Sequence, residues 1–229
     1  MWFDWLYLVI LAPGLLLALW AQLSVKSAYA RASRVRAHSG LTGAEAARRL
    51  LDRAGLREVG VEAAQGFLSD HYDPRKKVLR LSPEVHRGRS LASVGIAAHE
   101  AGHALQDAQN YAPLTIRNAV VPVAGLGSNL SFGLFFLGLI FALKPLLIAG
   151  IALFSGVVFF QLVNLPVEFN ASARAKRELV EAGIIMPEER KEVSRVLNAA
   201  AMTYVAATLT AILTLLYYLL RSGLIGGRR

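Results

Sequence analysis

The sequence predicts a mainly α-helical membrane protein, with about four transmembrane helices and a small α+β portion. The chain has 229 residues, 55% of them hydrophobic, and a mean hydropathy of +0.43. It is therefore too apolar for an ordinary soluble domain and too charged for a bundle of spans alone. Four apolar segments are also about twenty residues long, the length that crosses the hydrocarbon core of a bilayer. They cover about 5–23, 119–143, 145–163 and 199–220.

The first span is expected to be a retained anchor, because no Lys or Arg precedes it as in a signal peptide. Lys144 and Pro145 separate the second and third spans, which predicts a tight hairpin. The polar segments, about 24–118 and 164–198, are expected to join the spans in one membrane-integrated domain over 1–229. Buried helices of a soluble protein are the alternative, which runs of this length disfavour.

Basic residues predict the orientation of the chain in the membrane. The segment 24–118 holds 15 Lys or Arg and the segment 164–198 holds 6, whereas Lys144, Arg221, Arg228 and Arg229 are the only others. Because basic residues mark the cytoplasmic side, both polar segments are expected in the cytoplasm and both termini outside. The three C-terminal arginines count against this orientation, and positive charge is a weaker guide for a segment as long as 24–118.

Within the first polar segment, Thr42 to Glu45 has the capping-box pattern and predicts the start of a helix that Gly55 ends. Alternating apolar residues from Val59 to Leu81, around the turn residues Tyr72 to Arg75, predict a short β-hairpin. The strand at Val78–Leu81 is a candidate edge strand for an extended substrate, with a purely structural hairpin as the alternative.

The motif His99-Glu100-Ala101-Gly102-His103 carries the chemistry, since it lies in a helix-forming stretch from Leu91 to Ala108. Two histidines four residues apart share one helix face, so both imidazoles can reach one Zn²⁺. Glu100 lies beside them and can take a proton from a zinc-activated water that attacks a peptide carbonyl. This His-Glu-x-x-His pattern is typical of zinc peptidases.

A catalytic zinc needs a third protein ligand, and Asp107 and Glu168 are the candidates. Asp107 lies about 12 Å along the axis from His99 on a straight helix, which makes it a poor co-ligand. Glu168 follows the third span at the bilayer boundary, where a carboxylate needs a partner. A helix N-terminal carboxylate after Pro166 is the alternative interpretation of Glu168.

Three stretches resemble the neutral zinc metallopeptidases of the YugP type, which are small bacterial membrane proteins, over nearly the whole chain. They are Ala98 to Ala104, Ser69 to Ser82 and Pro166 to Ser172. The chain is more distantly similar to the HtpX and CAAX prenyl endopeptidases, membrane gluzincins whose third zinc ligand is a glutamate on a later helix. That resemblance implies that Glu168 binds zinc and that the protein is a multi-pass protein of the bacterial inner membrane.

One residue departs from those relatives, which carry an aspartate where this chain has Ser172. Support for a zinc histidine is therefore expected from elsewhere, with Asn170 and Asp107 as candidates. A tetrahedral oxyanion also needs a donor opposite the metal, and His71 or Tyr72 could supply it, unless both are ordinary turn residues.

These features predict a zinc-dependent endopeptidase at the cytoplasmic membrane surface, with Glu100 as base and His99, His103 and Glu168 as ligands. A peptide or membrane-protein substrate and the lipid bilayer are the expected partners, and an oligomer is compatible with the glycines of the second span. The net charge of +9 is explained by anionic lipid headgroups without nucleic acid. The alternative is a non-catalytic membrane scaffold or assembly factor with a structural zinc site.

Overall fold

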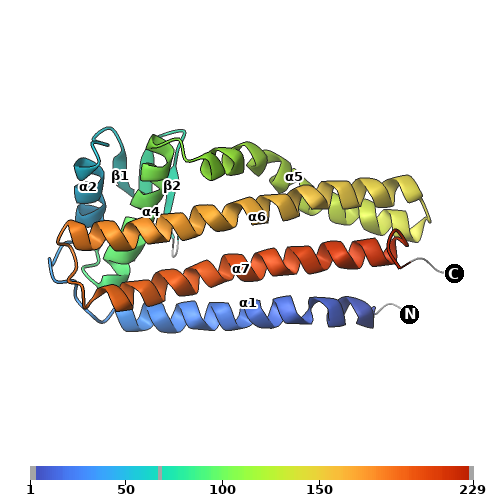
Figure 1. Ribbon diagram of the computed structural model, residues 1–229, viewed down its shortest axis with the longest axis horizontal. Helices are drawn as coiled ribbons and strands as arrows, with labels where there is room; N and C mark the ends of the chain where they lie inside the picture. Colours follow the sequence, from blue (N-terminus) through green and yellow to red (C-terminus); the bar gives the residue numbers. More distant parts are fainter. Residues whose placement is uncertain (1–3, 67–68, 227–229) are drawn as a thin grey trace. The chain divides into compact units, whose positions relative to one another are not determined.

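The computed structural model describes residues 4–66 and 69–226, and the fold is mainly helical with one small sheet (Figure 1). In chain order the elements are α1 (Trp5–Ala32), α2 (Gly43–Arg53), β1 (Gly60–Ala63), β2 (His71–Asp73), β3 (Val78–Leu81), α3 (Pro83–Arg87), α4 (Leu91–Ala108), α5 (Ala112–Ile140), α6 (Lys144–Glu181) and α7 (Arg190–Arg221). The predicted fold class is confirmed.

Four of the described helices, α1, α5, α6 and α7, are long and apolar enough to cross a membrane. They contain the four predicted spans, except that α5 ends at Ile140 and not at residue 143. Ala142 has a positive φ of 53°, so the turn starts inside the apolar run, where hydropathy alone cannot detect it. Arg228 and Arg229, two of the C-terminal arginines that count against the predicted orientation, lie outside the described residues.

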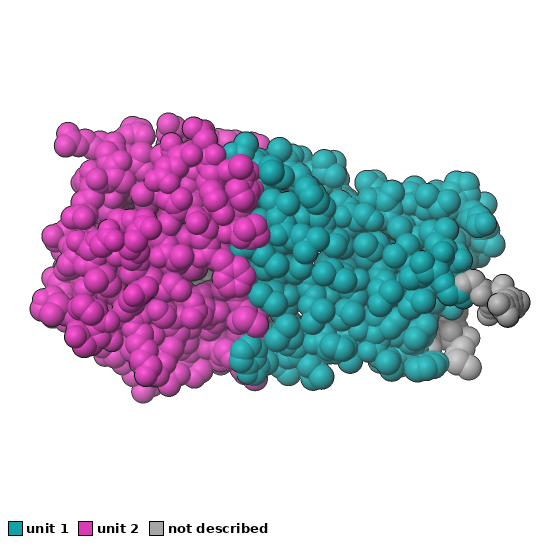
Figure 2. All heavy atoms as spheres, viewed as in Figure 1, with its two compact units in different colours: residues 1–20, 115–165, 203–229 teal, residues 21–114, 166–202 magenta. Residues whose placement is uncertain are grey.

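The chain divides into two compact units, coloured separately in Figure 2. Unit 1 comprises 1–20, 115–165 and 203–229, and unit 2 comprises 21–114 and 166–202. All predicted site residues belong to unit 2. The prediction of a single domain over 1–229 stays a prediction.

Aromatic side chains pack the described part of unit 1. The rings of Phe135 and Tyr218 stack with centroids 3.9 Å apart, and Tyr7 meets Tyr217 edge to face at 5.0 Å. The Tyr217 hydroxyl also donates to the Asp4 carboxylate at 2.8 Å. These contacts tie the start of α1 to the end of α7 within this unit.

Unit 2 contains a three-stranded sheet in the order β1-β3-β2. A hairpin is present within the predicted range, formed by β2 and β3, which are antiparallel with Tyr72 opposite Leu79. Its first strand differs from the prediction, because Tyr72 and Asp73 of the predicted turn belong to β2 and Val61 belongs to β1. The strand β1 pairs with the other side of β3 in parallel. The proposed substrate role of Val78–Leu81 as an edge strand is therefore wrong, because β3 is central and both of its edges are occupied. Among the described strands, β1 and β2 form the two edges of the sheet.

The buried core of unit 2 surrounds α4, whose alanines at 97, 98, 101 and 104 are at most 1% exposed. Their small side chains let neighbouring elements approach α4 closely. The helix α2 packs on it through Ala46, Ala47, Leu50 and Leu51, all at most 2% exposed. The predicted capping box is confirmed: Thr42 Oγ1 accepts from Glu45 N, and the Glu45 carboxylate accepts from Thr42 N.

We expect Thr42→Ala to destabilise unit 2 by about 1 kcal/mol, because it removes the side chain that caps α2. The measurement is the unfolding midpoint of the full-length protein in detergent. Thr42→Ser keeps the hydroxyl and should leave the midpoint unchanged. Equal midpoints for the alanine variant and the wild type would show that the cap contributes nothing.

Candidate metal centre

The helix α4 presents the two motif histidines on one face. It starts at Ser90, whose hydroxyl accepts from Ser93 N and caps the helix. Because His99 and His103 are one turn apart, their rings meet edge to face with centroids 4.8 Å apart. The side chain of His99 is 14% exposed and that of His103 is 9% exposed. The pair therefore lies in a mostly buried environment that is more open at His99.

Gly102 allows α6 to approach this face of α4. A Cβ added at Gly102 would lie 2.8 Å from the backbone oxygen of Ala171. Because that neighbour is backbone, it could not move aside as a flexible side chain would. The glycine between the two histidines therefore makes room for α6, which carries Glu168 and Ser172 on either side of this contact.

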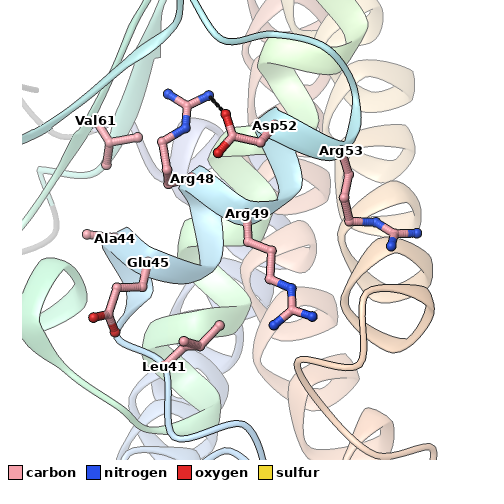
Figure 3. A pocket seen from close by; sticks show the side chains of 8 residues that line it. All are labelled: Leu41, Ala44, Glu45, Arg48, Arg49, Asp52, Arg53 and Val61. Atoms are coloured by element: carbon pink, nitrogen blue, oxygen red, sulfur yellow. Dashed lines mark ion pairs between the residues drawn. The ribbon is translucent and has the colours of Figure 1, made fainter.

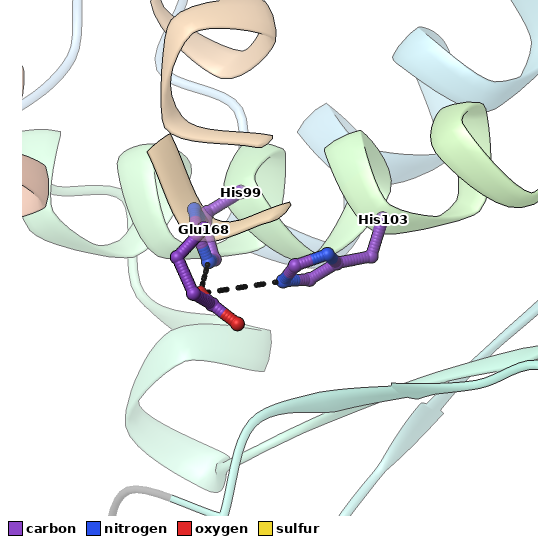
Figure 4. A group of neighbouring side chains, drawn as sticks. All are labelled: His99, His103 and Glu168. Atoms are coloured by element: carbon purple, nitrogen blue, oxygen red, sulfur yellow. Dashed lines mark hydrogen bonds and ion pairs between the residues drawn. The ribbon is translucent and has the colours of Figure 1, made fainter. Parts of the chain in front are cut away.

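The side chains of His99, His103 and Glu168 converge from these two helices (Figure 4). Glu168 Oε2 lies 3.2 Å from His99 Nε2 and 3.7 Å from His103 Nε2. Ligand atoms about 2.0 Å from a tetrahedral zinc lie about 3.3 Å apart, so both separations fit zinc. The three ligand atoms all lie within 4.8 Å of one another, so small side-chain adjustments bring them to one ion. The donor set of two imidazoles and one carboxylate is one that zinc prefers and leaves a fourth position open.

The charges at this centre suit a cation. Burial alone would raise the pKa of Glu168, which lies beyond the predicted span, but the neighbouring imidazoles of His103 and His99 outweigh burial and lower it. Burial likewise disfavours the charged form of His103, yet its contact with Glu168 and the charge of Glu100 raise its pKa overall. The carboxylate therefore stays ionised and favours positive charge between the imidazoles.

Ser172 supports His99 directly. Its hydroxyl oxygen lies 3.1 Å from His99 Nδ1, and the side chain is buried. The expectation that this support comes from elsewhere is wrong, because the hydroxyl at this position itself reaches the imidazole. Asp107, one of the two proposed substitutes, is hydrogen-bonded to another partner.

Gln106 supports His103 and was not identified from the sequence. Its Oε1 lies 3.0 Å from His103 Nδ1, and the residue is fully buried. Its Nε2 donates to Val167 O at 2.8 Å and to Asn170 Oδ1 at 2.9 Å. Asn170, the other proposed substitute, thus supports the centre through Gln106 and on the side of His103. The sequence does contain a signal for this role: Gln106 is a polar residue three positions after His103, on the same face of a largely apolar helix.

Glu100 lies next to the ligand pair and is 8% exposed. Among the hydrogen bonds and ion pairs of the described residues, none uses its carboxylate. A buried carboxylate beside an open metal position can accept a proton from a water molecule there. This is the environment expected of a general base.

The edge strand β2 contacts α4 through Tyr72, whose hydroxyl donates to Asp107 Oδ2 at 2.9 Å. Burial and this hydrogen bond raise the pKa of Tyr72. Asp107 therefore anchors β2 and does not join the group that could hold a metal. His71 is exposed, and its Nδ1 lies 2.8 Å from Ser69 O. The oxyanion role of either residue stays a prediction.

A hollow of about 790 Å³ lies elsewhere on unit 2, along α2 and beside Val61 of β1 (Figure 3). Within it Arg48 pairs with Asp52 at 3.0 Å. The residues that line this hollow include neither His99, Glu100 and His103 nor Glu168. This hollow is therefore not part of the metal centre, although it is large.

Fold and site together define a class: helical membrane proteins with a zinc centre of the peptidase type. The family model described as "Putative neutral zinc metallopeptidase" matches residues 7–223, so the chain belongs to that family, and zinc is its cofactor. The chain is also 47% identical over 215 residues to the "Putative membrane protease YugP" of Bacillus subtilis (strain 168). That alignment covers 94% of this chain and 95% of the relative. No solved structure matched the chain. The resemblance to the YugP type is confirmed.

We expect Gly102→Ala to weaken zinc binding by at least about tenfold, because the added methyl displaces α6 and with it Glu168. The zinc dissociation constant is measured by competition with a chelator. Gly125→Ala is the matched control, since nothing lies within 4 Å of a Cβ there. Alanine favours a helix over glycine by about 1 kcal/mol, so unchanged zinc affinity with higher stability would show that the close approach is not needed.

Proposed function

We propose that the protein is a zinc-dependent endopeptidase that cleaves peptide bonds at the cytoplasmic surface of a bacterial inner membrane. His99, His103 and Glu168 are the zinc ligands of this proposal, which makes it a gluzincin, and Glu100 is its general base. The observation that carries the proposal is the convergence of these three ligand atoms beside a buried carboxylate that makes no hydrogen bond or ion pair among the described residues. The family to which the chain belongs supports the same chemistry.

Zinc held at this centre supplies a Lewis acid that activates water and polarises a peptide carbonyl. The chain supplies the proton transfer: the Glu100 carboxylate accepts a proton from the attacking water and then delivers it to the leaving amine. The hydroxyl of Ser172 and the amide of Gln106 keep the two imidazoles turned toward the metal. A peptide bond must therefore reach the open side of the centre near His99, the most exposed ligand.

The substrate is proposed to be a peptide or a membrane protein, because the centre belongs to a chain with four helices able to cross a bilayer. The excess of basic residues in 24–118 and 164–198 supports a cytoplasmic location of the centre. No nucleic acid is required by this proposal, and an oligomer is compatible with it.

The enzyme is distinguished from a scaffold with a structural zinc by two substitutions. Glu100→Gln should keep one zinc per chain and lose casein cleavage by at least about a hundredfold, because the base is gone. Glu168→Ala should lose zinc itself. Metal content by mass spectrometry and cleavage by detergent-purified protein are the two measurements.

Full cleavage by Glu100→Gln would contradict the proposed base. Wild type with one zinc and no cleavage of casein or of membrane-protein substrates would favour the scaffold. Carefully purified wild type without zinc would contradict the whole proposal.

The orientation is tested with single cysteines, since the chain has none of its own. Lys76→Cys and Lys144→Cys replace exposed lysines, one in the first polar segment and one at the turn between α5 and α6. In intact cells a membrane-impermeant maleimide should label position 144 and leave position 76 unlabelled until the cells are lysed. The reverse pattern would place the metal centre outside.

A further inference from the structure

We propose that Arg174, Asn170 and Gln106 form a directional hydrogen-bond relay that fixes which ring nitrogen of His103 faces the metal. The inference rests on the proposed zinc site and deepens it. In it, Gln106 is a positioning residue that acts on the ligand, and Asn170 and Arg174 act through Gln106. All four residues lie in unit 2.

The relay begins at a group that can only donate. A guanidinium carries no acceptor, and Arg174 Nε lies 2.7 Å from the Asn170 side chain. The atom of Asn170 that faces it must therefore be the oxygen, Oδ1, and not the amide nitrogen. Arg174 is itself held by Gln109 Oε1 at 2.6 Å and lies over the Tyr111 ring, 6.0 Å from its centroid.

The orientation of Asn170 then determines that of Gln106. Asn170 Oδ1 and the backbone oxygen of Val167 are both acceptors, 2.9 and 2.8 Å from the same end of the Gln106 amide. That end must be the NH₂ group, which has two protons to donate. The opposite end, Oε1, is therefore the one that faces His103.

The amide oxygen in turn determines the tautomer of His103. Because Gln106 Oε1 can only accept, His103 Nδ1, 3.0 Å away, must carry the proton. In the neutral ring this leaves the lone pair on Nε2, the nitrogen 3.7 Å from Glu168 Oε2. Gln106 is fully buried, so water does not offer His103 an alternative acceptor at this place. The relay thus keeps Nδ1 protonated and makes Nε2 the nitrogen that faces the metal.

Zinc affinity of the full-length protein in detergent tests the relay. Gln106→Met has a similar shape and no hydrogen bonds, so it should weaken zinc binding by about 10- to 100-fold. Cobalt substituted for zinc should show an altered visible absorption spectrum in this variant, which reports ligand geometry independently of activity. Asn170→Leu should weaken zinc less, because Val167 O still orients Gln106.

Two comparisons separate the relay from simple packing. Asn170→Asp keeps an oxygen that accepts from both Arg174 and Gln106, so it should retain wild-type affinity where Asn170→Leu does not. The double variant Gln106→Met with Asn170→Leu should bind zinc no more weakly than Gln106→Met alone, since Asn170 acts only through Gln106. Asn198→Leu, at an exposed amide of the same unit, is the control for an amide replaced by leucine.

Wild-type affinity and spectrum in Gln106→Met would overturn the relay and leave the proposed function intact. Additive losses in the double variant, or equal losses in Asn170→Asp and Asn170→Leu, would also overturn it, because packing alone explains both. Asn170 is only partly buried, so the single variants Asn170→Asp and Asn170→Leu test the relay even where Gln106→Met fails to fold. A wild type that binds no zinc would instead contradict the proposed function itself.

Discussion

The close approach of α4 and α6 at Gly102 is the constraint on which the metal centre depends. Two residues of α6 that contact the motif histidines, Glu168 and Ser172, lie within one turn of Ala171, whose backbone meets the glycine. A side chain at position 102 would separate the helices and move the candidate ligand Glu168 and the hydroxyl of Ser172 away from the histidines together. Gly102 is therefore needed for the side chains of α4 and α6 to converge, and it does more than separate the two histidines in the sequence.

Much of the fold and of the site was predictable from local sequence signals. The four long helices follow from apolar length, and the start of α2 follows from Thr42 and Glu45. His99 and His103 follow from helix periodicity alone. Glu168 required the family resemblance, because no local pattern links it to a helix 65 or more residues earlier.

Two of the errors have a common physical source, which is that they concern contacts between segments. The sequence of β3 does not reveal that β1 occupies its second edge, since parallel pairing leaves no turn signature between the two strands. Support for a zinc histidine was expected from residues other than Ser172, because the relatives carry an aspartate at this position. The helix contact at Gly102 brings the hydroxyl within 3.1 Å, and only the packed structure contains that distance.

The shortness of β2 limits how a substrate can be recognised. It has three residues, and on an antiparallel edge only alternate residues direct their backbone groups outward. An extended chain pairing there would gain hydrogen bonds to one or two residues, each worth about 0.5–1.5 kcal/mol net. Such a contact discriminates poorly and binds weakly. Confinement of enzyme and substrate to one membrane would raise their effective concentration and compensate for this weak binding.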